Sequence, residues 1–260
     1  MEKTEKTPKD RLVFALDVDE GKEAEDIIEN IGADVGWMKM NSIFLGAYVY
    51  LRDTGKDLLA MIDAKGSKRF MDLKFHDIPF TLSKYVKQLK KLGVGMFNVH
   101  TQGSIAMMKT AVETVNEIYK DDPENKPIIL GVTILTSINQ QMLEDELGYK
   151  VPLKEQVVFL AKKAKEAGLD GVVASVHEVK RIKEACGEDF LVLTPGIKFE
   201  EEIKDTGKQD DQQRKATPDV AAEEGSNFIV MGRSLLKNVK ENVPRALNLI
   251  GEGLKRRKAA

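Results

Sequence analysis

Eight short apolar runs, separated by longer amphipathic segments, constrain the fold of this chain more than any other feature. The runs are 12–17 (LVFALD), 35–40 (VGWMKM), 69–74 (RFMDLK), 95–100 (GMFNVH), 128–135 (IILGVTIL), 170–175 (DGVVAS), 190–194 (FLVLT) and 227–232 (NFIVMG). Apolar runs of this length are typical of strands that are buried on both faces. The segments between them have helical periodicity, as in 82–92, where Leu82, Val86 and Leu89 recur at three- and four-residue steps.

This alternation predicts a (β/α)8 TIM barrel, because eight strand–helix units fit its usual length. A doubly wound open sheet is the alternative, and it usually has a glycine-rich turn after its first strand. The segment 17–21 (DVDEG) follows the first run here and is acidic, so it is not suited to hold a dinucleotide. We expect residues 1–260 to form one barrel domain with polar tails at about 1–10 and 252–260.

Composition narrows the possible partners and compartments. The chain has 40 Lys and Arg against 42 Asp and Glu, so we expect no nucleic-acid partner. We find no run of 18 apolar residues and no apolar leader, and we expect no membrane association. Cys186 is the only cysteine, which fits a reducing compartment, and a cytoplasmic location is expected.

Charged residues collect at the ends of the predicted strands. Asp17, Lys39, Asp72 and Lys74 all stand near the carboxyl ends of their runs, where barrel enzymes place their chemistry. Residues two apart on a strand share a face, so Asp72 and Lys74 are expected to point into the barrel, with Asp77 in the loop beyond. Lysines that alternate with carboxylates stay protonated, and such an array could deliver a proton to a carbanion.

A second group follows the seventh and eighth predicted strands, which is the usual phosphate site of these barrels. Gly196 and Gly232 would let backbone N–H groups approach phosphate oxygens, and Arg233 would supply a bidentate cation. A short helix near Ser234 is expected to present its positive end to the same site. The polar segment 198–215 is a candidate lid. No cluster of His, Cys and Asp residues in the sequence matches a structural zinc site.

The segment 70–81 (FMDLKFHDIPFT) resembles the D-x-K-x-x-D-I-P-x-T signature of orotidine 5′-phosphate decarboxylases. Further matches follow in chain order, from 15–17 (ALD) and 38–39 (MK) through 133–137 (TILTS) and 194–197 (TPGI) to 211–214 (DQQR), 217–218 (TP) and 232–233 (GR). Asn41, Ser104 and Lys198 depart from the family pattern, which commonly has glycine, glycine and arginine there. The resemblance implies a cofactor-free barrel that works as a homodimer and converts orotidine 5′-monophosphate (OMP) to UMP and carbon dioxide, the last step of de novo UMP biosynthesis.

The resemblance also implies a role for each matching residue. Lys74 would protonate C6 of the pyrimidine, Asp72 would lie beside the substrate carboxylate, and Lys39 would bridge this network to the ribose. The other matches would bind substrate: Asp17 a ribose hydroxyl, Ser137 the pyrimidine edge, Pro195 the carboxylate pocket, and Gln212 with Gly232 and Arg233 the phosphate. Asp77 and Thr81 would complete the neighbouring subunit's site.

Two other functions remain as alternatives. A sugar-phosphate lyase on the same barrel, such as a 3-keto-gulonate 6-phosphate decarboxylase, shares D-x-K-x-x-D but needs magnesium and a further acidic ligand. Ile78-Pro79 with Thr81, together with Gln212, argues against it. A barrel that binds a nucleotide without turning it over is the non-enzymatic alternative, and the intact pair Asp72 and Lys74 argues against that.

Overall fold

A computed structural model describes residues 6–204 and 214–259. Within these residues, eight parallel strands close into a barrel in the order β1 to β8, with β1 paired to β8. The strands are β1 (Leu12–Ala15), β2 (Trp37–Met40), β3 (Lys68–Phe75), β4 (Met96–His100), β5 (Ile128–Val132), β6 (Gly171–Val173), β7 (Leu191–Thr194) and β8 (Phe228–Met231). The predicted (β/α)8 barrel is confirmed, and each strand overlaps one predicted run.

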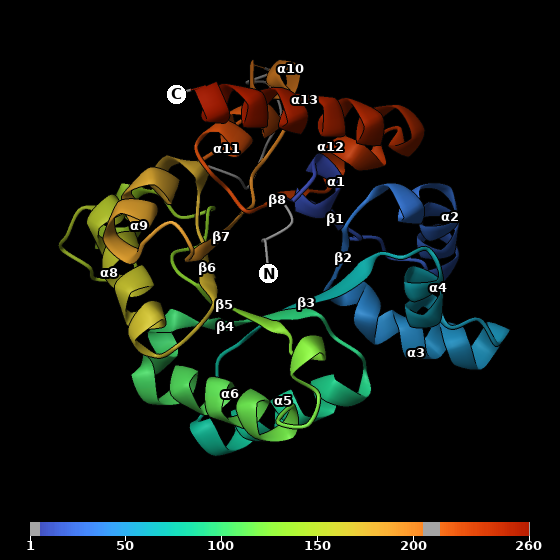
Figure 1. Cartoon of the computed structure of the whole chain (residues 1–260), viewed down its shortest axis with the longest axis horizontal. Helices are drawn as coiled ribbons and strands as arrows, with labels where there is room; N and C mark the ends of the chain where they lie inside the picture. The colour runs from blue at the N-terminus through green and yellow to red at the C-terminus, as the bar shows by residue number, and fades with distance from the viewer. Residues whose placement is uncertain (1–5, 205–213, 260) are drawn as a thin grey trace.

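Helices surround the strands as an outer ring (Figure 1). They are α1 (Pro8–Arg11), α2 (Gly21–Ile31), α3 (Ser42–Thr54), α4 (Leu58–Ala64), α5 (Pro79–Lys91), α6 (Ser104–Ile118), α7 (Gln140–Asp145), α8 (Leu153–Glu166), α9 (Val179–Cys186), α10 (Glu200–Lys204), α11 (Pro218–Glu223), α12 (Arg233–Leu236) and α13 (Val239–Ala259). The helix predicted over 82–92 starts earlier because Pro79 occupies its first turn, where proline's missing N–H costs nothing. None of the helices in the described ranges is long and apolar enough to cross a membrane.

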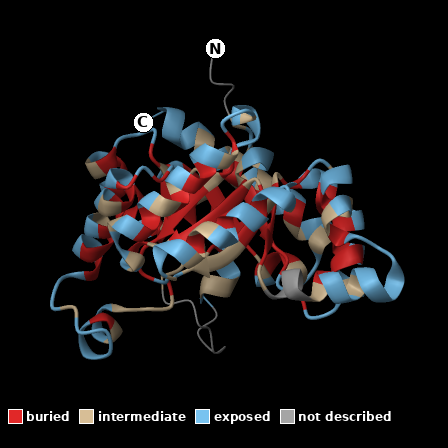
Figure 2. Ribbon diagram, turned by 90° about the horizontal axis from the view of Figure 1, so that it is seen from below, coloured by how far each residue is buried: buried red, intermediate tan, exposed pale blue. Residues whose placement is uncertain are grey.

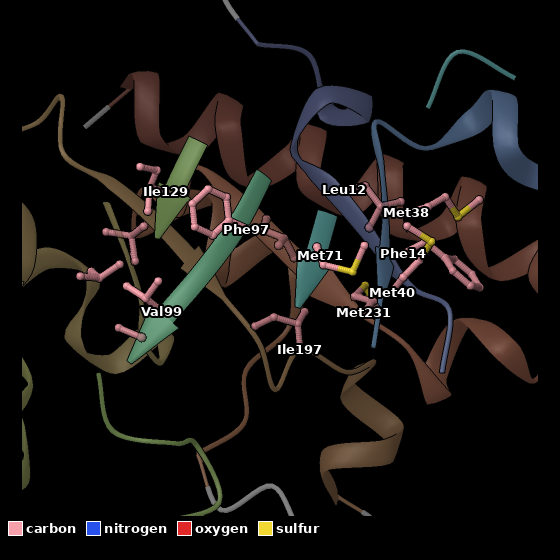
Figure 3. Packing of buried hydrophobic residues seen from close by; sticks show 14 of the residues in the cluster. Leu12, Phe14, Met38, Met40, Met71, Phe97, Val99, Ile129, Ile197 and Met231 are labelled. Carbon is pink, nitrogen blue, oxygen red and sulfur yellow. The ribbon is translucent and has the colours of Figure 1, made fainter. Parts of the chain in front are cut away.

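Two apolar cores hold the barrel together. The outer core lies between strands and helices, where Phe14, Met38, Met71 and Phe97 are fully buried (Figure 3). The inner core fills the barrel, with Trp37 and Phe228 packed edge to face at 5.6 Å between ring centroids. Figure 2 shows the result: buried strands in the middle and exposed residues on the outer helix faces.

The structure describes the two predicted polar tails to different extents. Residues 1–5 lie outside the described part of the chain, and Pro8–Arg11 forms α1. The C-terminal segment is helical to Ala259 as the last turns of α13. There Arg256 pairs with Asp219 and Glu223, at 2.7 and 2.6 Å, so these ion pairs connect the end of α13 to α11.

Ser104 has backbone angles that favour glycine. It begins α6 with φ +82° and ψ 162°, a region in which an L side chain is strained. The resemblance described above implies glycine at this position, so the serine carries a conformational cost here.

Candidate active site

Four charged side chains form a continuous chain of ion pairs at the carboxyl end of the barrel. Lys39 on β2 lies between two carboxylates, with its Nζ 3.1 Å from Asp17 Oδ1 and 3.1 Å from Asp72 Oδ2. Lys74 Nζ lies 2.8 Å from the other oxygen of Asp72. The alternating array expected from the sequence is therefore present as Asp17–Lys39–Asp72–Lys74, with each charge next to an opposite one.

Burial makes the centre of this network sensitive to its partners. The side chains of Lys39 and Asp72 are only 7% and 10% exposed, whereas that of Lys74 is 34% exposed toward the barrel mouth. Burial by itself raises the pKa of Asp72. The attraction of Lys39 and Lys74, and the hydrogen bonds from Lys74 and Asn98, outweigh burial and hold that pKa below its ordinary value of 3.8. Asp72 is thus kept ionised by its neighbours.

An irregularity in β3 brings Lys74 to this position. Met71 pairs with Phe97 of β4, but the next registered pair is Phe75 with Val99, so β3 has two more residues than β4 over this stretch. Lys74 lies in this bulge with φ +47°, a left-handed conformation that costs a non-glycine residue about 1–2 kcal/mol. Simple strand alternation predicted that Lys74 would face the barrel. It does, but through a bulge rather than a regular pleat.

The ion pairs line one wall of a cavity of about 350 Å³. Its floor is apolar and includes Phe70, Val173 and Val230. Of the residues expected to bind substrate, Asp17, Lys39, Asp72, Lys74, Ser137, Pro195, Gly196, Gly232 and Arg233 line it. A cavity of this size, with an apolar floor and a few converging polar groups, is typical of a small-molecule site.

The predicted phosphate-binding residues lie together at the β7–β8 side of this cavity. Gly196 has φ +77°, a conformation that glycine adopts without strain. At Gly232 a Cβ atom would lie 3.1 Å from the Cβ of Ala15, so a side chain there would crowd β1. The expected helix near Ser234 is α12, a single turn of 4 residues starting at Arg233. Its dipole is therefore small.

Two of the expected site residues that the structure describes, Asp77 and Thr81, do not line the cavity. Gln212 lies outside the described residues, as does half of the candidate lid. The Asp77 carboxylate accepts hydrogen bonds from two groups of its own chain, the Ile78 N–H at 2.7 Å and the Tyr85 hydroxyl at 3.0 Å. Thr81 lies in the first turn of α5. No ion pair between Asp77 and Lys74 occurs within the described ranges of this chain.

Asn98 is a polar residue of the site that the sequence interpretation missed. It lies in β4, is 1% exposed and lines the cavity. Its side chain contacts both Asp72 and the backbone of Lys74. The available signal was an asparagine in the middle of the apolar run 95–100, where it must be hydrogen-bonded to be tolerated.

The histidines near the site do not line the cavity. The rings of His76 and His100 lie 5.3 Å apart. Burial, followed by repulsion from His76 and Lys74, lowers the pKa of His100 and keeps its ring neutral at neutral pH. Across residues 6–204 and 214–259, no group of three or more His, Cys, Asp or Glu side chains is arranged to hold a metal ion.

Fold and site together define a class of protein: a (β/α)8 barrel enzyme with an alternating lysine–aspartate network and a candidate phosphate site at the carboxyl ends of its strands. A family model described as Orotidine 5′-phosphate decarboxylase / HUMPS family matches residues 10–245. The chain belongs to this family, and the resemblance inferred from its motifs is confirmed.

Curated relatives and solved structures agree with this assignment. The chain is 44% identical over 225 residues to the orotidine 5′-phosphate decarboxylase of Syntrophotalea carbinolica, covering 86% of this chain and 87% of the relative. It is 37% identical over 251 residues to that of Heliobacterium modesticaldum, covering 96% and 99%. The crystal structure of the Lactobacillus acidophilus orotidine 5′-phosphate decarboxylase matches with a TM-score of 0.73 and 34% identity, covering 94% of this chain and 98% of that one.

Proposed function

We propose that this chain converts OMP to UMP and carbon dioxide in pyrimidine biosynthesis. The observation that carries the proposal is the placement of Lys74 Nζ 2.8 Å from Asp72 at the wall of a cavity with an apolar floor. An ammonium group beside a fixed carboxylate suits a reaction that expels a carboxyl group and then needs a proton at the same carbon. The curated relatives, which bear the name orotidine 5′-phosphate decarboxylase, support the same activity.

In the proposed reaction the bond between C6 of the pyrimidine and its carboxylate breaks. The electron pair stays on C6 and carbon dioxide leaves. The Lys74 ammonium then gives a proton to C6, which forms the C–H bond of UMP, and the neutral amine recovers a proton from solvent. Asp72 lies beside the substrate carboxylate, so repulsion between the two anions is relieved as carbon dioxide departs.

The rest of the substrate is held by the other cavity residues. We assign Asp17 and Lys39 to the ribose hydroxyls, Ser137 to the pyrimidine edge, and Pro195 to the apolar wall over the carboxylate. Gly196, Gly232 and Arg233 bind the phosphate, and Gln212 joins them from the lid segment. These assignments are supported by the cavity lining, because every residue named here that the structure describes lines the same cavity.

The reaction is proposed to need no metal and no other cofactor. Both oxygens of Asp72 already accept from ammonium groups, from Lys39 at one oxygen and Lys74 at the other, so they are poorly placed to ligate a cation. A cytoplasmic location is proposed on the single, buried Cys186, which needs no oxidising compartment.

The active unit is proposed to be a homodimer in which Asp77 and Thr81 complete the site of the neighbouring subunit. Beside Asp77, the side chains of Ile78 and Phe80 are 65% and 69% exposed, which is unusual for large apolar residues and suits burial against a second copy. In a two-fold interface the same edge meets itself, so each copy can supply Asp77 to the other.

The test is turnover of OMP by the purified chain without added metal, with and without a chelator. Loss of pyrimidine absorbance and release of carbon dioxide in both conditions are expected. The Lys74→Ala variant should lose product formation and keep its fold. The Lys22→Ala variant, which removes a 63% exposed lysine of α2, is the matched control. No turnover by the wild type, or dependence on a divalent metal, would contradict the proposal.

A further inference from the structure

Asn98 connects the two central groups of the ion-pair network. Its Nδ2 donates a hydrogen bond to Asp72 Oδ1 at 2.6 Å, and its Oδ1 accepts one from the backbone N–H of Lys74 at 2.8 Å. Because it faces a carboxylate at one end and an N–H group at the other, the orientation of the amide is determined. Asparagine is the side chain of this length that can donate to the first and accept from the second.

The position of Asn98 on β4 gives this side chain its direction. Its neighbours Phe97 and Val99 belong to the outer core, whereas Met96, two residues earlier, belongs to the inner core. Asn98 therefore points into the barrel, at the level where β3 bulges away from regular pairing with β4. A polar side chain here reaches backbone groups that a regular ladder would pair with backbone.

The hydrogen bond to Lys74 supports a strained segment. Lys74 has φ +47°, and such a conformation persists only where its surroundings hold it. Asn98 Oδ1 supplies the acceptor for the Lys74 N–H, taking the place of a ladder carbonyl. The same amide fixes the Asp72 oxygen to which Lys74 Nζ is bound, so one side chain holds both ends of the Asp72–Lys74 pair.

We propose that Asn98 is a positioning residue that orients the Asp72 carboxylate and the Lys74 ammonium for decarboxylation and C6 protonation. This inference rests on the proposed function and adds to it a residue that need not touch the substrate. Its role is to keep the Lys74 ammonium aimed at the reacting carbon while Asp72 stays ionised and in place.

The first test replaces Asn98 by alanine. We expect kcat for OMP to fall about 10- to 100-fold, the usual range for losing a hydrogen bond to a charged group. KM for OMP and the Kd for UMP should change less than about threefold, because phosphate and ribose contacts are untouched. A residue with only a structural role would lower Tm and leave kcat per folded molecule unchanged.

The matched control is Asn227→Ala. Asn227 also bridges a backbone N–H and a charged group, accepting from the Val192 N–H at 2.9 Å and from Lys183 Nζ at 2.8 Å, but it does not line the cavity. Its loss should lower Tm without lowering kcat. A kcat for Asn98→Ala within twofold of the wild type would overturn the proposal.

The second test uses the nearly isosteric Asn98→Asp variant. It tests the positioning role of Asn98 even if the alanine variant does not fold. When it is protonated, the introduced carboxyl group can still donate to Asp72, whereas its ionised form repels that residue. Lys39 from β2 and Lys74 from β3 contact Asp72, and His100 at the end of β4 interacts with it electrostatically. Asp17, beyond β1, lies on the far side of Lys39 and contacts that lysine.

Two neighbouring buried carboxyl groups share one proton, so the kcat of Asn98→Asp should fall as the pH rises through about 5 to 8. The wild type should show no such fall over this range. A profile that matches the wild type would overturn the proposal. Absence of OMP turnover by the wild type itself would instead count against the proposed function, so the two failures are distinct.

Discussion

Replacement of Lys39 by methionine isolates the contribution of the charge at the centre of the network. Methionine has nearly the length of lysine without its ammonium, so the cavity wall is kept. The change removes the partner that lies 3.1 Å from both Asp17 and Asp72 and leaves Asp72, which is 10% exposed, with only Lys74 as an ion-pair partner.

The magnitude follows from the distances and burial. Two unit charges about 3 Å apart attract by about 5 kcal/mol at an effective dielectric constant of about 20. Part of this is offset by desolvation, and removal of one partner of a buried pair typically costs about 3–5 kcal/mol. Asp17 is 43% exposed and adds little. If the loss falls on the active form, in which Asp72 is ionised, kcat/KM for OMP should drop about 150- to 5000-fold.

The pH dependence supplies an independent readout. In the wild type the pKa of Asp72 lies below 3.8, so its contribution to stability is complete above that value and is lost as the pH falls through the lower folded-state pKa. Without Lys39, burial outweighs the remaining attraction and the pKa rises. The acid limb of kcat/KM should therefore move to higher pH. The free energies of unfolding of the wild type and the variant should converge as the pH is lowered below about 4.

The assay is loss of pyrimidine absorbance across a pH series, with denaturant unfolding of the same preparations. Lys22→Met is the control, because its ion pair with Asp26 joins side chains that are 63% and 59% exposed and is expected to contribute little to stability. If kcat/KM of Lys39→Met stayed within tenfold of the wild type, Asp72 would not depend on Lys39 and the reasoning would be refuted.

Three further changes test other parts of the molecule. Arg233→Ala should lose about 2–4 kcal/mol of transition-state stabilisation, measured as kcat/KM; a loss below about 0.5 kcal/mol would place the phosphate elsewhere. Mixing inactive Lys74→Ala and Asp77→Ala chains under conditions of subunit exchange should restore up to about one quarter of wild-type activity if sites are shared, and no recovery despite exchange would confine Asp77 to its own subunit. Ser104→Gly should stabilise the fold by about 1 kcal/mol in denaturant unfolding, since it relieves φ +82°. Ser83→Gly inside α5 should instead destabilise it by about 0.5–1 kcal/mol, and equal effects would contradict the strain at Ser104.

The sequence predicts the barrel well because the signal is repeated eight times and each run is buried on both faces. It also predicts that Asp17, Lys39, Asp72 and Lys74 converge, since all four stand at carboxyl ends of strands. It does not predict the bulge in β3, because the two extra residues appear only when β3 is paired with β4. The sequence does not predict the role of Asn98 for a related reason. Its partners are a backbone N–H and a carboxylate on the neighbouring strand, 24 and 26 residues away.

Asp72 is held by three donors, and this bears directly on how the proposed reaction could work. Lys39 binds one of its oxygens, while Lys74 and Asn98 bind the other. A carboxylate held in this way cannot rotate away when the substrate carboxylate arrives beside it. In the proposed reaction, the repulsion between the two anions is then relieved by loss of carbon dioxide. After that loss the new negative charge lies on C6, next to the ammonium of Lys74. In the proposed reaction, the interactions that keep Asp72 in place would therefore favour decarboxylation over rearrangement of the site.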